Sequence, residues 1–87
     1  MPAKNASVAA LGRAVRTIRV ERGISQEEAG HRTGIGRSFY GRVERGEVSP
    51  TYETILKLSA GLEVGPAEIV ALAERYRLGR AQPPTDS

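Results

Sequence analysis

The stretch SQEEAGHRTGIGRSFYGRVER, residues 25–45, has the pattern of two short helices joined by a tight turn. Ser25 followed three residues later by Glu28 forms a capping box, which predicts the start of a helix. Gly34 adopts a positive φ at low cost, so the first helix is expected to end just before it and the chain to turn sharply. A second helix is expected over residues 37–45.

The second predicted helix has two unlike faces. At about 100° per residue, one face collects mostly polar residues that can donate hydrogen bonds: Arg37, Ser38, Gly41, Arg42 and Arg45. Phe39, Tyr40 and Val43 point to the other side, where a core is expected. A helix with this division presents a polar face to a partner while its apolar face packs inward.

Two further residues suit a crossed pair of helices. Gly30 provides a small residue where the second helix lies across the first, and Ile35 provides an apolar plug in the turn. Arginine can pair with both O6 and N7 of guanine in the major groove of DNA. We therefore expect a helix-turn-helix, with Arg37 and Arg42 reading bases and Arg45 contacting phosphate near the helix end.

The rest of the chain continues as short helices separated by glycine and proline. No segment shows the sustained alternation of a strand, so the predicted fold is all-α and compact, with five helices. The helices are expected at residues 7–22, 25–33, 37–45 and about 51–60, with a last helix that begins at 66 and ends at 73 or, alternatively, at 77. The predicted division is a flexible arm at 1–6, a DNA-binding domain at 7–78 and a flexible polar tail at 79–87.

Composition limits the classes of function. The chain has 87 residues, which is one domain, and its net charge of +3 weakly favours an anionic partner. With no cysteine and with His31 as the only histidine, expected on the exposed side of its helix, neither a metal site nor a catalytic constellation is predicted. No apolar run approaches the roughly 20 residues of a membrane span. We expect no enzyme activity, no cofactor, no membrane partner and no small-molecule ligand.

The ordered set of motifs resembles the lambda-repressor-like domains of the Cro and phage-repressor type, also called the XRE family. The matching residues run from Val15 to Ile69 without gaps. They are Val15-Arg16-x-Ile18-Arg19, Gly23-Ile24-Ser25-Gln26-Glu27-Glu28, Gly34-Ile35-Gly36-Arg37-Ser38, Arg42-Val43-Glu44-Arg45-Gly46, Ser49-Pro50-Thr51 and Ile55-Leu56-x-Leu58.

The resemblance implies a role for each matched position. Gln26 would bind a DNA phosphate and brace the recognition helix, with Arg45 on the DNA backbone and Gly41 allowing close approach. The positions that would read bases are Arg37, Ser38 and Arg42. Arg19 and Glu44 match an ion pair within the family's fold, which would make Glu44 structural.

This chain also departs from the family pattern. Ala29 and Gly30 give the first helix of the motif less apolar volume than usual, so we expect Phe39 and Tyr40 to compensate from the second helix. Gly36 stands where serine is commoner, which predicts a weaker helix cap. Glu47 places an acid in a loop that often meets phosphate, which opposes that contact.

These observations predict a transcriptional regulator that binds a palindromic operator in double-stranded DNA as a homodimer. The last helix and its extension would supply the dimer interface through some of its apolar residues, which are Ile69, Val70, Leu72, Ala73 and Tyr76. A stand-alone regulator of the phage-repressor type, a restriction-modification controller and a toxin–antitoxin antitoxin all fit. A protein-interaction adaptor of this fold is a further alternative, which the polar face of the recognition helix disfavours. We expect a cytoplasmic location on bacterial or phage DNA. Tyr52 is expected in the core, and Arg13 and Arg22 on a solvated face.

Overall fold

The computed structural model describes residues 5–80, which form five α-helices and no strand. The helices are α1 (Ala6–Glu21), α2 (Gln26–Thr33), α3 (Arg37–Glu44), α4 (Tyr52–Leu62) and α5 (Pro66–Arg77). The predicted all-α, five-helix class is confirmed, and each predicted boundary lies within a residue or two of the observed one, with α5 ending at the later of its two predicted ends. Most of the predicted arm and tail lies outside the described residues.

Short polar side chains fix where three of the helices begin. The side-chain oxygens of Asn5, Ser25 and Thr51 accept hydrogen bonds from backbone N–H groups at the starts of α1, α2 and α4. Such N-caps satisfy donors that have no partner within the helix. Asn5 and Ala6 therefore belong to the helical domain, which corrects the predicted arm of 1–6. The cap of α3 is Gly36, which provides no side-chain hydrogen bond, as expected.

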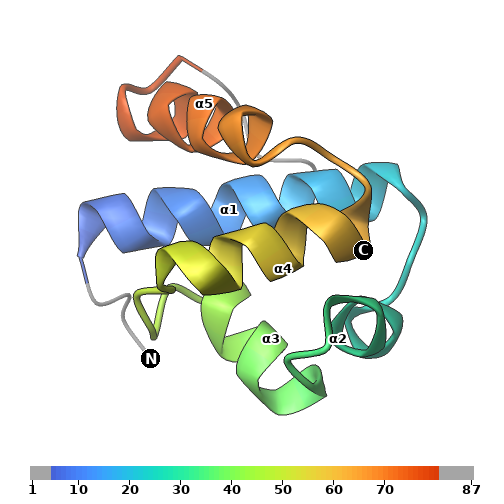
Figure 1. The fold of residues 1–87 in the computed structure, drawn as a ribbon. Coiled ribbons are helices and arrows are strands. Elements are labelled where there is room, and N and C mark those ends of the chain that lie inside the picture. Colours follow the sequence, from blue (N-terminus) through green and yellow to red (C-terminus); the bar gives the residue numbers. More distant parts are fainter. Residues whose placement is uncertain (1–4, 81–87) are drawn as a thin grey trace.

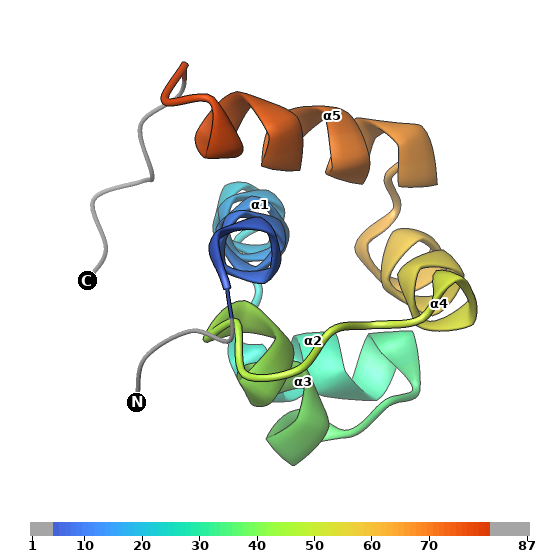
Figure 2. The same cartoon turned by 90° about the vertical axis from the view of Figure 1, so that its left-hand side faces the viewer.

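Helix α1 runs through the middle of the molecule (Figure 1). Seen along α1 in Figure 2, α5 crosses on one side, α2 and α3 lie on the opposite side, and α4 closes a third side. Packing contacts connect α1 with α3, α4 and α5, and α2 with α3 and α4. The main core between these helices consists of Val15, Ile18, Ala29, Tyr40, Val43, Leu58, Leu62 and Ile69.

Helix α5 packs closely on α1 through small residues. Ala10 and Ala14 of α1 meet Ala73 and Tyr76 of α5 in a second buried cluster. The hydroxyl groups of Thr17 and Tyr76 are hydrogen-bonded at 2.5 Å across the same contact. Alanine side chains allow two helices to approach, and the aromatic ring then fills the space beside them.

This packing buries, within one protomer, three of the residues that were predicted to form a dimer interface. Ile69 is fully buried, and Ala73 and Tyr76 are each 7% exposed, because they cover α1 within the same protomer. Leu72 is only partly buried, and Val70 is 45% exposed. An apolar stripe on a helix predicts burial without saying which partner provides it, and here the partner is α1 of the same chain.

One further prediction fails near α4. Tyr52, expected in the core, is 73% exposed on the first turn of this helix. Arg22 is exposed, as expected, and it also donates hydrogen bonds to the carbonyl oxygens of Leu62 and Glu63 at 2.9 and 2.7 Å. Cations at a helix C-terminus interact favourably with its unpaired carbonyl groups. Arg22 thus ties the end of α1 to the end of α4.

Candidate nucleic-acid interface

The crossing of α2 and α3 depends on glycine. A Cβ atom added at Gly30 would lie 2.6 Å from the backbone nitrogen of Arg37, so only glycine fits without a backbone shift. The backbone N–H of Gly36 donates to the carbonyl of Gly30 at 3.1 Å and closes the turn. Gly34 has a φ of 77°, a left-handed conformation that glycine adopts at low cost. The predicted tight turn and the close helix contact are both present.

The polar face of α3 lies on the surface as the sequence predicts, with one exception. Arg37, Ser38, Arg42 and Arg45 are exposed, and about half of the side-chain area of Arg42 and of Arg45 is open to solvent. Gly41 is buried, because the side chains of Arg45 and Gln26 lie over it. Gly41 therefore makes room for protein side chains and does not itself form open surface.

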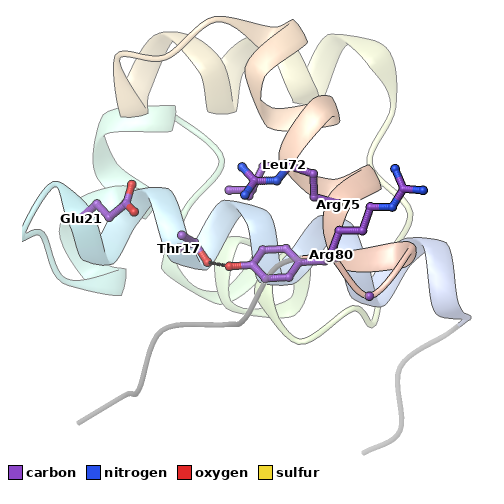
Figure 3. A pocket seen from close by; sticks show the side chains of 7 residues that line it. Thr17, Glu21, Leu72, Arg75 and Arg80 are labelled. Carbon is purple, nitrogen blue, oxygen red and sulfur yellow. Dashed lines mark hydrogen bonds between the residues drawn. The ribbon is translucent and has the colours of Figure 1, made fainter.

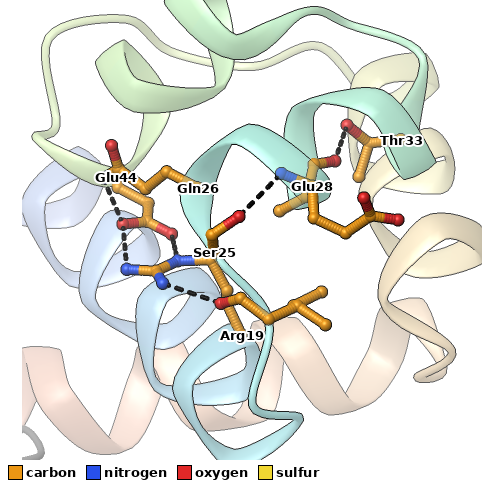
Figure 4. Close-up of polar contacts among 8 residues, drawn as sticks. Arg19, Ser25, Gln26, Glu28, Thr33 and Glu44 are labelled. Carbon is orange, nitrogen blue, oxygen red and sulfur yellow. Dashed lines mark hydrogen bonds and ion pairs between the residues drawn. The ribbon is translucent and has the colours of Figure 1, made fainter.

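A buried polar network holds α3 in place (Figure 4). Glu44 accepts hydrogen bonds from Arg19 Nε at 2.6 Å and Arg19 Nη2 at 3.2 Å, while Arg19 Nη1 donates to the Ile24 carbonyl at 3.0 Å. Gln26 Nε2 donates to the same carboxylate at 2.9 Å. The expected Arg19–Glu44 pair and the bracing role of Gln26 are therefore both present, and they join α1, α2 and α3.

Electrostatics within this network favour its paired form. The hydrogen bond to Glu44 raises the pKa of Arg19, with burial acting in the opposite direction. Burial raises the pKa of Tyr40 far above its ordinary value, and the neighbouring Glu44 charge adds to the rise. Tyr40 is fully buried and supplies core volume beside Ala29, as the departures in sequence predict.

A second carboxylate lies at the far end of α3. Glu47 accepts hydrogen bonds from Arg45 Nε at 2.7 Å and Arg45 Nη2 at 3.4 Å, and its Oε1 is 3.9 Å from Arg42 Nε. The hydrogen bond with Arg45 holds the pKa of the Glu47 carboxyl below its ordinary value. Two arginines of the candidate surface thus share one acidic neighbour.

One residue that positions α3 was not singled out from the sequence. A Cβ at Gly12 of α1 would lie 2.4 Å from the carbonyl oxygen of Glu44, so α1 and the end of α3 touch along their backbones. Gly12 and Arg19 lie about two turns apart on one face of α1, and both meet Glu44. The sequence signal that could have pointed to Gly12 is the presence of a glycine inside a predicted helix.

Comparison with known proteins places this arrangement in a family. Residues 15–69 match the family described as helix-turn-helix, and the chain belongs to that family, of the Cro/C1 or XRE type. The chain is 40% identical over 60 residues to the cryptic phage CTXphi transcriptional repressor RstR of Vibrio cholerae, covering 69% of this chain and 54% of that protein. It is 32% identical over 62 residues to the uncharacterized HTH-type transcriptional regulator y4dJ of Sinorhizobium fredii, covering 71% and 80%.

Two more comparisons extend the likeness. The HTH-type transcriptional regulator SutR of Escherichia coli is 35% identical over 54 residues, covering 62% of this chain and 30% of SutR. The chain thus spans about half of RstR and under a third of SutR. The restriction-modification controller protein C.AhdI from Aeromonas hydrophila has a similar structure, with a TM-score of 0.73 and 35% identity over 75% of this chain and 98% of that one.

These relatives are named as regulators or as a controller, and none as an enzyme, in agreement with the expectation from sequence. Over residues 5–80, no helix combines the length and apolar character needed to cross a bilayer. The same residues contain no group of three or more histidine, cysteine or acidic side chains placed to hold a metal ion.

Proposed function

We propose that this protein is a transcriptional regulator that binds double-stranded DNA with sequence specificity by placing α3 in the major groove. The observation that carries the proposal is the exposed face of α3, where Arg37, Ser38 and Arg42 project from a helix held rigidly by the buried Glu44 network. Base readout needs hydrogen-bond donors and a fixed position of those donors relative to the bases, and this helix supplies the donors on an anchored backbone. Such a regulator acts on nucleoid or phage DNA in the cytoplasm.

Gln26 has a second part in the proposal. Its Nε2 group donates one hydrogen bond to Glu44, and the second hydrogen of that amide is the candidate phosphate donor. The N-terminus of α2 and the exposed Arg45 are further candidate phosphate contacts. Phosphate contacts set the position of a recognition helix, and base contacts set its sequence preference. Gln26 would therefore affect all DNA sequences alike, both by bracing α3 and by contacting phosphate.

We further propose that two copies bind a palindromic operator, with recognition helices about 34 Å apart. A single short recognition helix provides limited affinity, and joining two raises the effective concentration of the second. The candidate contact is the outer side of α5, where Val70 is exposed. A groove of about 500 Å³ also lies between α1 and α5, lined by Leu72 and Tyr76 among others (Figure 3).

The names of the similar proteins favour two of the biological settings. RstR is a phage transcriptional repressor and C.AhdI is a restriction-modification controller, so a stand-alone repressor or a controller is preferred over an antitoxin. The genes beside this one would separate the settings, because a controller lies next to a nuclease and a methyltransferase.

The central test is selection from a random duplex library, followed by binding titrations at several salt concentrations. We expect an enriched palindrome and an affinity that falls steeply as salt rises, because phosphate contacts release counterions. Weak salt dependence together with no enriched sequence would refute DNA recognition.

Two substitutions then separate readout from anchoring. Arg42→Ala should relax the preference at one base position, at a cost of about 1–3 kcal/mol for the preferred base. Gln26→Ala should weaken binding to all duplexes about equally. Unchanged specificity in Arg42→Ala would remove Arg42 from the base-reading set.

The homodimer is tested separately by sedimentation. Val70→Glu should shift the protein toward monomer and weaken binding to a palindrome more than to a half-site. Ala60→Glu, at an exposed position of α4, is the matched control and should change neither. A wild-type protein that stays monomeric on a full palindrome would contradict the proposed assembly.

A further inference from the structure

Glu47 is held firmly at the end of the recognition helix. Gly46 has a φ of 71°, and the backbone N–H groups of Gly46 and Glu47 donate to the carbonyls of Val43 and Arg42 at 3.0 and 2.9 Å. This pair of bonds is a Schellman motif, which fixes the residue after the glycine relative to the last helical turn. The Glu47 carboxylate therefore starts from a defined backbone position beside α3.

The side chain turns back toward the arginines of the candidate DNA surface. Glu47 binds Arg45 through two hydrogen bonds and lies 3.9 Å from Arg42, and only 16% of its side-chain area is exposed. A negative charge at a helix C-terminus interacts unfavourably with the helix dipole. The dipole of α3 therefore disfavours the Glu47 carboxylate at this position, and Arg42 and Arg45 offset that cost.

We propose that the Glu47 carboxylate competes with DNA phosphate for the guanidinium group of Arg45. This competition limits the strength of DNA binding without changing its sequence preference. The proposal rests on the DNA-binding function proposed above. A guanidinium group binds the oxygens of a carboxylate and those of a phosphate through the same paired hydrogen bonds. In the free protein the Glu47 carboxylate occupies the donors Arg45 Nε and Nη2 that a phosphate would use.

Glu47 lowers the affinity for every DNA sequence by about the same factor. Arg45 must leave Glu47 to contact a phosphate whichever bases lie in the groove, so the cost is common to specific and random duplexes. Once displaced, the carboxylate remains at the rim of the interface, where it repels neighbouring phosphates. Both effects lower affinity, and neither involves a base edge.

The test is Glu47→Gln, titrated at several salt concentrations with an enriched duplex and a random duplex of equal length. We expect tighter binding to both, and a slope of log affinity against log salt that is steeper by about one. The advantage over wild type should shrink about threefold between about 50 and 200 mM salt. The ratio of affinities for the two duplexes should stay within about threefold of the wild-type ratio.

The matched control is Glu74→Gln on α5. Glu74 also pairs with an arginine on the surface, at 2.6 Å from Arg77, and its removal changes the net charge by the same amount. Because α5 lies across α1 from α3 (Figure 2), this variant should leave the salt slope unchanged on a half-site duplex, which one protomer binds without the proposed α5 contact. Equal slopes for Glu47→Gln and Glu74→Gln would overturn the proposal, and so would a larger change in the duplex ratio, which would mean that Glu47 reads a base.

A double variant tests the route through Arg45. In an Arg45→Ala background, Glu47→Gln should have a smaller effect, because the group that it releases is gone and only the repulsion of phosphates is relieved. An undiminished effect would overturn the route through Arg45. If Glu47→Gln failed to fold by circular dichroism, the Arg45 Nε–H signal in ¹⁵N NMR spectra of the wild-type protein would decide. That signal should shift on saturation with duplex, and an unchanged signal would refute displacement. Wild-type protein that binds no DNA would instead refute the proposed function, which keeps the two failures distinct.

Discussion

Helices α3 and α5 both pack against α1, but they are held there by different means. Helix α5 rests on small apolar residues, Ala10, Ala14 and Ala73, with one hydroxyl pair between Thr17 and Tyr76. Helix α3 is tied to the other side through a charged network centred on Glu44. Apolar contact favours burial without fixing a direction, whereas hydrogen bonds to a carboxylate do fix one. The helix that carries the candidate reading face therefore has the more directional attachment.

The helix-turn-helix formed by α2 and α3 stays ordered although α2 contributes few large apolar side chains. Ala29 and Gly30 leave α2 with little apolar volume, and Gly12 and Gly30 bring backbones into direct contact. Close backbone approach and polar bonds together position α3 where large side chains are missing. The α1–α5 contact has no comparable demand, since it only has to bury surface. Three substitutions, in decreasing order of their predicted cost in stability, test this contrast between α3 and α5.

Glu44→Ala should cost about 3 kcal/mol of unfolding free energy, the largest effect of the three. The Glu44 side chain is 2% exposed, and its loss leaves the Arg19 guanidinium, which also donates to the Ile24 carbonyl, without its carboxylate partner. Urea unfolding monitored by circular dichroism measures the change. Glu44→Gln is the control and should lose less, because an acceptor oxygen remains. Equal losses for alanine and glutamine would mean that the network's hydrogen bonds contribute little.

Gly30→Ala should cost about 2 kcal/mol, because its Cβ would lie 2.6 Å from the Arg37 backbone nitrogen and α3 would have to move. Gly41→Ala is the matched control within α3, since its Cβ would meet only the ends of flexible side chains, Arg45 at 3.1 Å and Gln26 at 3.7 Å. The control should be neutral or gain up to about 1 kcal/mol from helix propensity. Thermal melts of the two variants compare them directly. A Gly30→Ala protein as stable as Gly41→Ala would contradict the close backbone contact.

Tyr76→Phe should have the smallest effect, a loss of about 1 kcal/mol, because it removes the hydroxyl bonded to Thr17 and keeps the ring. Tyr52→Phe, at a tyrosine that is 73% exposed, should leave stability unchanged. Both are measured by urea unfolding. A loss in Tyr76→Phe as large as that in Glu44→Ala would erase the distinction between the two attachments.

Local sequence signals account for most of the fold. Capping residues, glycine stops and helical spacing predict all five helices of the described chain, because each depends on contacts within a few residues. The same local logic placed the arginines of α3 on one exposed face and predicted a positive φ at Gly34. The Arg19–Glu44 pair was available only through family resemblance, since its members are far apart in sequence.

Local sequence patterns define the set of helices and the face that α3 presents. The tertiary packing sets which partner buries each apolar stripe. It placed Ile69, Ala73 and Tyr76 against α1 of the same chain and left Tyr52 exposed. It also brought Glu47 onto Arg45 and Gly12 onto the end of α3. A helical period fixes which side chains share a face, but what covers that face depends on long-range packing, which no local pattern contains.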